Sequence, residues 1–226
     1  MREFVWRWDT LPQYHENFWR GLLTTFELSV IIIVCAAIGG VIIGAARYSK
    51  NRAFNWPATA FIEIFRNTPI LVQIVWFFYA FPVLLGGQLE GFYAALLGIG
   101  LNITAYSAEI FRGGIQSIER GQWEAARSIG MNYLQVMRRV VLPQAIRRMI
   151  PAFANRVIEA VKATSLASTI AVADLMFEGE QLANTIYRPF EVYTAVAIIY
   201  FFAIYPLVLG TYWLERFMAI EEEVKL

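Results

Sequence analysis

Five long apolar stretches, separated by shorter polar segments, account for most of the chain. They cover approximately residues 22–46, 57–85, 91–111, 150–177 and 192–214. Each stretch exceeds the ~20 residues that an α-helix needs to cross ~30 Å of hydrocarbon. The pattern therefore predicts an all-α, polytopic membrane protein with about five transmembrane helices.

The segment 112–149 interrupts this pattern, because it is too polar to span a membrane and too long for a plain loop. It contains seven arginines and no lysine, and its apolar residues are spaced as in amphipathic helices. One short helix is expected to end at Gly130, and a second to begin after Asn132.

The second of these helices is predicted over about 133–141, where Leu134, Met137 and Val141 share one face. Leu142-Pro143 is expected to end it, since proline has no N–H to donate to a continuing helix. Two short helices joined at a glycine would form a compact knob below the membrane, able to dock into a cleft of another protein.

Composition supports the membrane assignment and excludes several other classes. Hydrophobic residues make up 58% and charged residues 16% of the chain, against about 45–50% and roughly 25% in soluble domains. With one cysteine and one histidine, internal disulfides and histidine zinc sites are excluded. A net charge of +1 argues against a nucleic-acid partner, which requires a gathered basic excess.

The distribution of basic residues predicts the orientation. Twelve of the 19 lie after the first stretch, in the 112–149 segment or at the C-terminus, and four lie on the opposite side. The positive-inside rule then places the N-terminus outside and the C-terminus in the cytoplasm. We therefore expect an extracytoplasmic or interfacial segment over 1–21, a transmembrane domain over 22–216 and a cytoplasmic tail over 217–226.

The 112–149 segment resembles the EAA loop of ABC importer permeases. That pattern, E-A-A-x3-G-x9-I-x-L-P, is matched with Val140 in the isoleucine position. The matching residues are Glu124, Ala125, Ala126, Gly130, Leu142 and Pro143. The resemblance implies the type I ABC importer permease fold, with these six residues at the contact with a cytoplasmic ATPase.

Flanking residues are similar to those of the polar amino acid permeases, the histidine, glutamate, glutamine and arginine type. The similar stretches are Phe65-Arg66-Asn67-Thr68-Pro69, Ala105-Tyr106, Ala108-Glu109, Arg112-Gly113-Gly114-Ile115, Lys162, Thr164-Ser165-Leu166 and Asp174-Leu175. Asn67 replaces the commoner glycine. The similarity implies a transmembrane subunit of an ATP-driven importer for polar amino acids, which supplies half of a translocation pathway in the bacterial inner membrane.

The resemblance also implies partners. These are a cytoplasmic ABC ATPase that binds the ATP and magnesium, a second permease chain (identical or a sister), an extracytoplasmic amino-acid-binding protein and membrane lipid. The chain itself is expected to bind no cofactor or metal and to have no catalytic residue. It has no Gly-Lys pair, and so no phosphate-binding loop of the G-x-x-x-x-G-K-[ST] type.

Charged residues inside the apolar stretches are expected to have a structural or functional role, because inserting a charged side chain at the bilayer centre costs about 2.5–3.5 kcal/mol. The candidate substrate path comprises Asn67, Thr68, Asn155, Arg156, Glu159, Lys162, Thr164 and Ser165. A self-satisfied ion-pair cluster at a dimer seam or near the cytoplasmic interface is the alternative for the fourth stretch. Two further pairs, Glu63 with Arg66 and Glu109 with Arg112, are expected to be local ion pairs, with a role in substrate binding or coupling as the alternative.

The substrate class is suggested by the fourth stretch, where Arg156 and Lys162 outnumber Glu159. This balance favours acidic or neutral polar amino acids, with glutamate and aspartate first. A secondary transporter or channel driven by an ion gradient is the alternative, but it leaves the helical knob unexplained. An intramembrane protease or acyltransferase is disfavoured, because His15 is the only histidine and precedes the first stretch.

Overall fold

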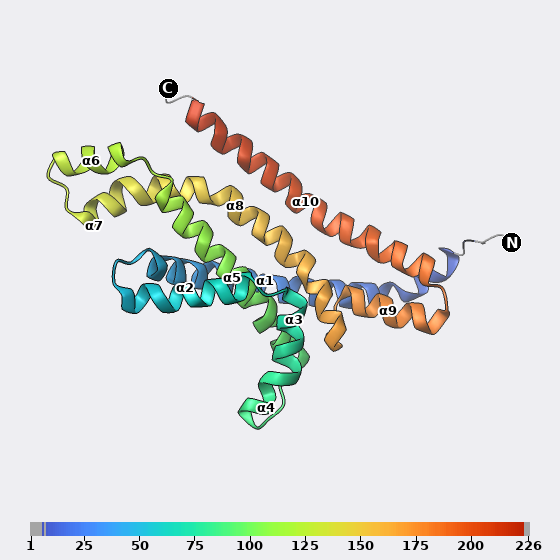
Figure 1. The fold of residues 1–226 in the computed structure, drawn as a ribbon. Helices are drawn as coiled ribbons and strands as arrows, with labels where there is room; N and C mark the ends of the chain where they lie inside the picture. Colours follow the sequence, from blue (N-terminus) through green and yellow to red (C-terminus); the bar gives the residue numbers. More distant parts are fainter. Residues whose placement is uncertain (1–5, 7, 224–226) are drawn as a thin grey trace. The chain divides into compact units, whose positions relative to one another are not determined.

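The structure is a computed structural model that describes residue 6 and residues 8–223. Every regular element within these residues is helical, so the predicted all-α fold is confirmed (Figure 1). Three helices are long and apolar enough to cross a membrane, or up to five if each of two bent pairs counts as one span. The predicted interfacial segment 1–21 and tail 217–226 lie partly outside the described residues.

The elements follow one another with short connections. In chain order they are η1 (Trp8–Tyr14), α1 (His15–Tyr48), α2 (Arg52–Arg66), α3 (Ile70–Val75), η2 (Trp76–Ala80), α4 (Phe81–Leu85), α5 (Gly91–Gln116), α6 (Arg120–Ser128), α7 (Tyr133–Val136), η3 (Met137–Val141), α8 (Leu142–Ala163), η4 (Thr164–Ile170), α9 (Leu175–Ile186) and α10 (Pro189–Glu223). Of these, η1 and η4 are 3₁₀-helices and η2 and η3 are π-helices.

Two of the five predicted stretches are broken helices. The second is interrupted between α2 and α3. Pro69, the residue before α3, has a non-helical ψ of 138°. Proline removes a backbone donor and disfavours helical geometry in the residue before it, so the helix ends there. The fourth stretch passes from α8 through η4 and is interrupted again before α9.

The helices divide into two compact units. Unit 1 contains residues 1–33, 69–100 and 158–207, and unit 2 contains residues 34–68, 101–157 and 208–226. The boundary between the units falls within four helices, α1, α5, α8 and α10, so each of them has one part in unit 1 and the other in unit 2.

In unit 1, the start of α9 is fixed by the fully buried carboxylate of Asp174. Its Oδ1 accepts a hydrogen bond from the N–H of Phe177 at 2.9 Å, and its Oδ2 accepts one from the hydroxyl of Tyr200 on α10 at 3.1 Å. The hydroxyl oxygen of Thr25 on α1 accepts a further bond from the N–H of Leu175 at 3.2 Å. Asp174 is therefore an N-cap that also joins α9 to α10.

In unit 2, glycines allow α1 to pack closely against α5. A Cβ at Gly40 would lie 2.5 Å from the Cβ of Ser107, and one at Gly44 would lie 2.7 Å from the carbonyl oxygen of Ala108. Gly40 and Gly44 form a G-x-x-x-G pattern, which lets two helix backbones approach within a membrane.

We predict that Gly40→Ala weakens this packing. The added methyl group would overlap Ser107, and overpacking of this kind typically costs about 1–3 kcal/mol. Thermal melting of the purified protein in detergent should therefore begin at a lower temperature than in the wild type. Gly100→Ala is the matched control, because a Cβ there meets nothing within 4 Å; equal melting of both variants would contradict the packing assignment.

Candidate functional site

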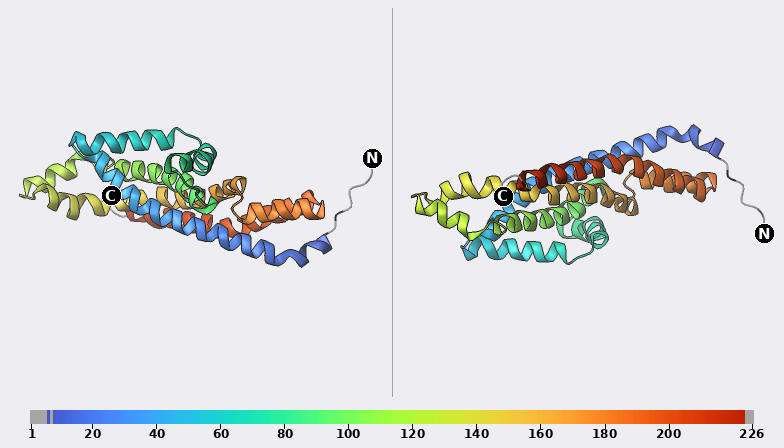
Figure 2. Two further views of the ribbon diagram at one scale, coloured as in Figure 1. Left: turned by 90° about the horizontal axis from the view of Figure 1, so that it is seen from below. Right: turned by 90° about the horizontal axis from the view of Figure 1, so that it is seen from above.

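The 112–149 segment forms the predicted pair of short helices. Helices α6 and α7 lie side by side beyond the start of α8 in every view (Figure 2). Gly130 between them has φ of +81°, a left-handed geometry that favours glycine. Asn132 caps α7 through a capping box: its Oδ1 accepts from the N–H of Gln135 at 3.0 Å, and its own N–H donates to Gln135 Oε1 at 2.9 Å.

The knob, defined here as residues 120–141, packs around an apolar core that it shares with α5 and α8. Ala126, Val136 and Val141 are buried against one another and against residues of α5 and α8. The indole of Trp123 on α6 and the ring of Tyr133 on α7 stack at 6.1 Å between centroids. This packing gives the compact pair of short helices that the sequence predicts.

The six residues of the EAA pattern do not share one surface. Glu124, Ala125, Gly130 and Pro143 are exposed, whereas Ala126 is buried and Leu142 is half-buried against the same core. The pattern thus combines residues that can touch a partner with residues that hold the knob together.

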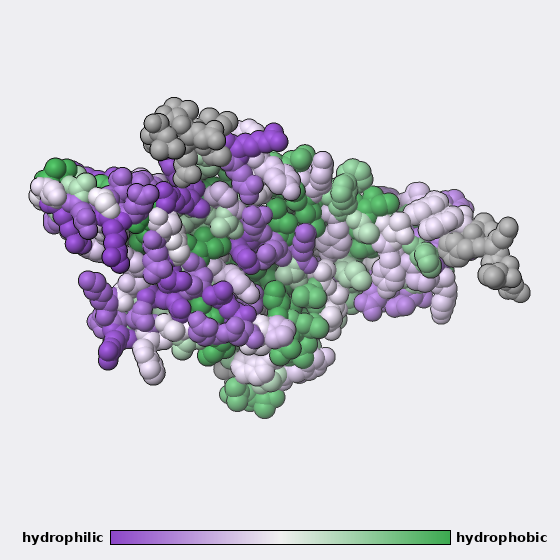
Figure 3. All heavy atoms as spheres, turned by 45° about the horizontal axis from the view of Figure 1, so that its top comes forward, coloured by the Kyte–Doolittle hydropathy of each residue, from purple (hydrophilic) through white to green (hydrophobic). Residues whose placement is uncertain are grey.

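An apolar patch lies at the tip of the knob among hydrophilic side chains (Figure 3). Its largest members are Ile129, 74% exposed, and Leu134, 73% exposed. Leu134 was expected to pack along one face with Met137 and Val141, and that expectation is wrong: Val141 is buried while Leu134 points to the surface. Large exposed apolar groups with a polar rim mark protein-protein contact sites.

The expectation that Leu142-Pro143 ends the second helix is also wrong. The helix continues through the π-helical turn η3 into α8, with the N–H of Leu142 donating to the carbonyl of Met137. A π-helical turn shifts the hydrogen-bond register by one residue, so the chain continues past a proline that cannot donate. The π-helical turn is not visible in the pattern of apolar residues.

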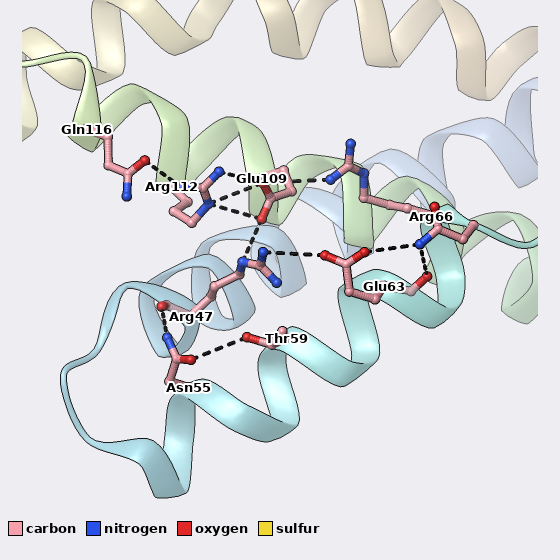
Figure 4. Close-up of polar contacts among 9 residues, drawn as sticks. Arg47, Asn55, Thr59, Glu63, Arg66, Glu109, Arg112 and Gln116 are labelled. Atoms are coloured by element: carbon pink, nitrogen blue, oxygen red, sulfur yellow. Dashed lines mark hydrogen bonds and ion pairs between the residues drawn. The ribbon is translucent and has the colours of Figure 1, made fainter.

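A cluster of charged side chains lies at the end of α5 in unit 2 (Figure 4). We call it the Glu109 cluster; its members are Arg47, Glu63, Arg66, Glu109 and Arg112. The Glu109 carboxylate pairs with Arg47 Nε at 2.9 Å, with Arg112 Nη2 at 2.8 Å and with Arg66 Nη1 at 3.7 Å.

The predicted local pair of Glu109 and Arg112 is therefore confirmed. Glu63 instead lies 3.4 Å from Arg47 Nη2, and Arg66 reaches Glu109, so these two residues have partners on other helices. Arg47 was read only as a basic residue of a cytoplasmic linker, and its approach to Glu109 was missed. The G-x-x-x-G pattern of Gly40 and Gly44, which begins two turns before it, was the available signal, because it predicts a closely packed neighbour.

Two of the candidate path residues follow α2 and bond back to it. Asn67 Nδ2 donates to the Glu63 carbonyl at 2.8 Å and to Glu63 Oε2 at 3.1 Å, and the Thr68 hydroxyl donates to the Ile64 carbonyl at 2.8 Å. The polar side chain in place of the commoner glycine thus closes the C-terminus of α2.

The other candidates lie on α8 and η4. Asn155, Glu159 and Lys162 are exposed and spaced by four and three residues, so they share one face of α8. Thr164 is buried and Ser165 is half-buried, and both hydroxyls donate to carbonyls of the preceding turn.

Arg156 packs on an aromatic ring in unit 2. Its Cζ lies 4.5 Å from the ring centroid of Tyr106, and the Cζ of Arg66 lies 5.1 Å from the same centroid. The two guanidinium groups thus share one tyrosine in cation-π contacts, which explains how an arginine is accommodated on an apolar helix.

The sequence model of one protein family, the binding-protein-dependent transport system inner membrane component, matches residues 19–220. The chain belongs to this family. The permease is 34% identical over 208 residues to the probable glutamine ABC transporter permease protein GlnM of Bacillus subtilis (strain 168), with 92% of this chain and 94% of the relative covered. It is 36% identical over 214 residues to the L-cystine transport system permease protein TcyB of the same organism, with 92% and 90% covered.

A third relative is the nopaline transport system permease protein NocM of Agrobacterium fabrum, 36% identical over 208 residues, with 86% of each chain covered. Among solved structures, the permease matches an amino acid ABC transporter with histidines at a TM-score of 0.84 and 31% identity, covering 97% of this chain and 99% of the other. A second match, the inward-facing MetNI methionine ABC transporter, has a TM-score of 0.74 at 20% identity, with 90% of this chain and 95% of that chain covered, and shares the fold. The predicted family and type I importer fold are confirmed.

We predict that Asn132→Ala loosens the start of α7. Loss of the capping box removes the acceptor for the Gln135 N–H and typically costs about 1 kcal/mol. Hydrogen exchange of the Gln135 amide should accelerate roughly fivefold, measured by mass spectrometry on knob peptides. Ser128→Ala, which removes a hydroxyl outside the capping box, should leave that amide unchanged; equal acceleration in both variants would refute the cap.

Proposed function

We propose that this permease is the transmembrane subunit of an ATP-driven importer for polar amino acids, acidic or neutral, with glutamate and aspartate first. It supplies half of the translocation pathway and couples it to a cytoplasmic ATPase. The observation that carries this proposal is the knob with an exposed apolar tip, in a chain whose relatives are named as permeases for glutamine, cystine and nopaline.

The knob is the proposed ATPase contact. Ile129 and Leu134 would enter an apolar cleft of the ATPase, and exposed arginines around them, such as Arg127 and Arg138, would meet an acidic rim. Glu124, Ala125 and Gly130 are accessible for the same contact, while Ala126 and Leu142 support it from inside. Pro143 lies on the surface where the knob leads into α8. ATP and magnesium would be bound by the ATPase, and this chain would hold no cofactor.

The remaining partners would meet other surfaces. In the most apolar 18-residue stretch of each span, 11% is buried in α10 and 33% in the span Trp8–Tyr48, against 61% in α5. The exposed apolar faces would contact lipid or a second permease chain, identical or a sister. An extracytoplasmic binding protein would deliver the amino acid on the side of the N-terminus, opposite the cytoplasmic C-terminus.

The proposed substrate path follows the polar face of α8. Asn155, Glu159 and Lys162 offer an amide, an acid and a base in a row, which suits the zwitterionic group of an amino acid. Arg156, Thr164 and Ser165 lie on the same helix or in the turn after it, and Asn67 and Thr68 would contribute from the break after α2. An ionisable group within an apolar span is expected to line such a path.

Glu124→Lys and Gly130→Val should disrupt coupling without preventing membrane insertion. The first reverses a charge at the docking surface, and the second forces a β-branched residue to a φ of +81°. ATP hydrolysis stimulated by substrate should fall on the order of tenfold in both, as for central interface residues. Gly121→Ala, also on α6 but with open space around it, should behave as wild type. Unchanged stimulation in the two test variants would refute the coupling assignment.

Competition assays in proteoliposomes test the substrate class. Uptake of labelled glutamate should require the ATPase and ATP, and excess aspartate or a neutral polar amino acid should reduce it more than lysine or arginine. If lysine and arginine compete best and glutamate does not compete, the substrate assignment is wrong. Uptake that persists without the ATPase but collapses with the ion gradient would identify a secondary transporter instead.

A further inference from the structure

A continuous chain of polar side chains runs through unit 2 from the break after α2 to the last residue of α5 (Figure 4). Its steps are Asn67 to Glu63 at 3.1 Å, Glu63 to Arg47 at 3.4 Å, Arg47 to Glu109 at 2.9 Å, Glu109 to Arg112 at 2.8 Å and Arg112 to Gln116 at 2.5 Å. The chain begins beside Pro69, where the helix is interrupted, and ends four residues before the knob.

Glu109 is the centre of this chain. Its side chain is only 15% exposed, and it pairs with Arg47 in the last turn of α1, with Arg66 in the last turn of α2 and with Arg112 one turn further along α5 itself. One carboxylate therefore joins the ends of α1 and α2 to α5. Ion pairs in such a partly buried site are screened less than those on a surface.

The charges of the cluster leave no substitute for Glu109. Three arginines face two carboxylates, and the second carboxylate, Glu63, is 52% exposed. Within the described residues, Arg47 Nη1 and Arg66 Nε are buried and have no hydrogen-bond acceptor. The cluster already has more donors than acceptors, so neutralising Glu109 would leave guanidinium groups that repel one another in a poorly solvated site.

The end of α5 is also fixed to the knob. Ile115 and Ile118, which come after Glu109 and Arg112 in the sequence, are buried in the same core as Ala126 and Val136 of the knob. Arg148 of α8 donates to the Ser117 carbonyl at 2.6 Å. A displacement of the knob must therefore move the end of α5, and with it Glu109.

We propose that Glu109 is a positioning residue for coupled transport. It fixes the end of α5 to α1 and α2, so that these helices move together when the knob moves. The movement then reaches the break at 67–69 through Arg47 and Glu63. The proposal rests on the proposed function, because it assigns a route between the ATPase contact and the translocation path. Energetic coupling between distant sites can be carried by a network of packed and hydrogen-bonded side chains of this kind.

The first test separates coupling from stability. In proteoliposomes that contain the complete transporter, Glu109→Gln should lower the amount of amino acid transported per ATP hydrolysed by about tenfold, while basal ATP hydrolysis persists. Glu109→Asp keeps the charge and should restore most of this ratio. Glu16→Gln is the matched control, since Glu16 also faces an arginine, Arg20, but in an exposed pair.

An equal loss of transport and ATP hydrolysis in Glu109→Gln, or an unchanged ratio, would overturn the proposal. The Asn67→Ala variant should lower the ratio in the same direction. Combined with Glu109→Gln it should add little further loss, because both interrupt one chain; additive losses would overturn the common route. If Glu109→Gln does not assemble, Asn67→Ala is compared with the wild type in its place.

The second test does not depend on the substrate. In a Cys35→Ser background, Thr68→Cys places a thiol at the break, and its rate of maleimide labelling is measured in the assembled transporter with and without ATP. ATP should change the rate when Glu109 is present, and Glu109→Gln should abolish that change. A response that survives Glu109→Gln overturns the proposal, whereas a normal response in a protein that imports no amino acid contradicts only the proposed function.

Discussion

Close packing of α1 on α5 in unit 2 is the contact on which the rest of that unit depends. Lipid is as apolar as leucine, so two membrane helices gain little from hiding apolar side chains and associate instead where small residues let their backbones approach. Gly40 and Gly44 allow this approach to Ser107 and Ala108. The same approach carries the end of α1 to the end of α5 and sets Arg47 within 2.9 Å of Glu109, which makes a stable charged cluster possible there.

The knob depends on this arrangement because it has no support of its own. Its core is completed by residues from α5 and α8, such as Phe111 and Met149, so its position follows from theirs. The π-helical turn η3 lets the chain pass from the knob into α8 past Pro143 without a break. The result is a projection with an apolar tip, packed against α5, which carries the Glu109 ion pairs.

Many features of the fold and site were predictable from particular residues. Gly130 and Asn132 predicted the turn of the knob, because a left-handed glycine and an asparagine cap are local chemistry, and Glu109 with Arg112 are three residues apart on one helix. Pro69 accounts for the break in the second stretch, because proline disfavours helical geometry in the residue before it. The path of the helix after Val136 was not predictable, because the apolar pattern is compatible with both α- and π-helical turns. Nor was the exposure of Leu134, since helical spacing shows which residues share a face but not which face is covered.

The sequence alone therefore determined the membrane location, the family, the helical class and the existence of the knob, because these follow from composition, periodicity and local motifs. Only the tertiary structure decided the partners of the charged residues. Arg47, Arg66 and Glu109 are far apart in the chain, and their meeting depends on how closely α1, α2 and α5 approach, which is a property of backbone packing. Local spacing alone could not have chosen Arg47 as the partner of Glu63, because charges on other helices compete with those one turn away.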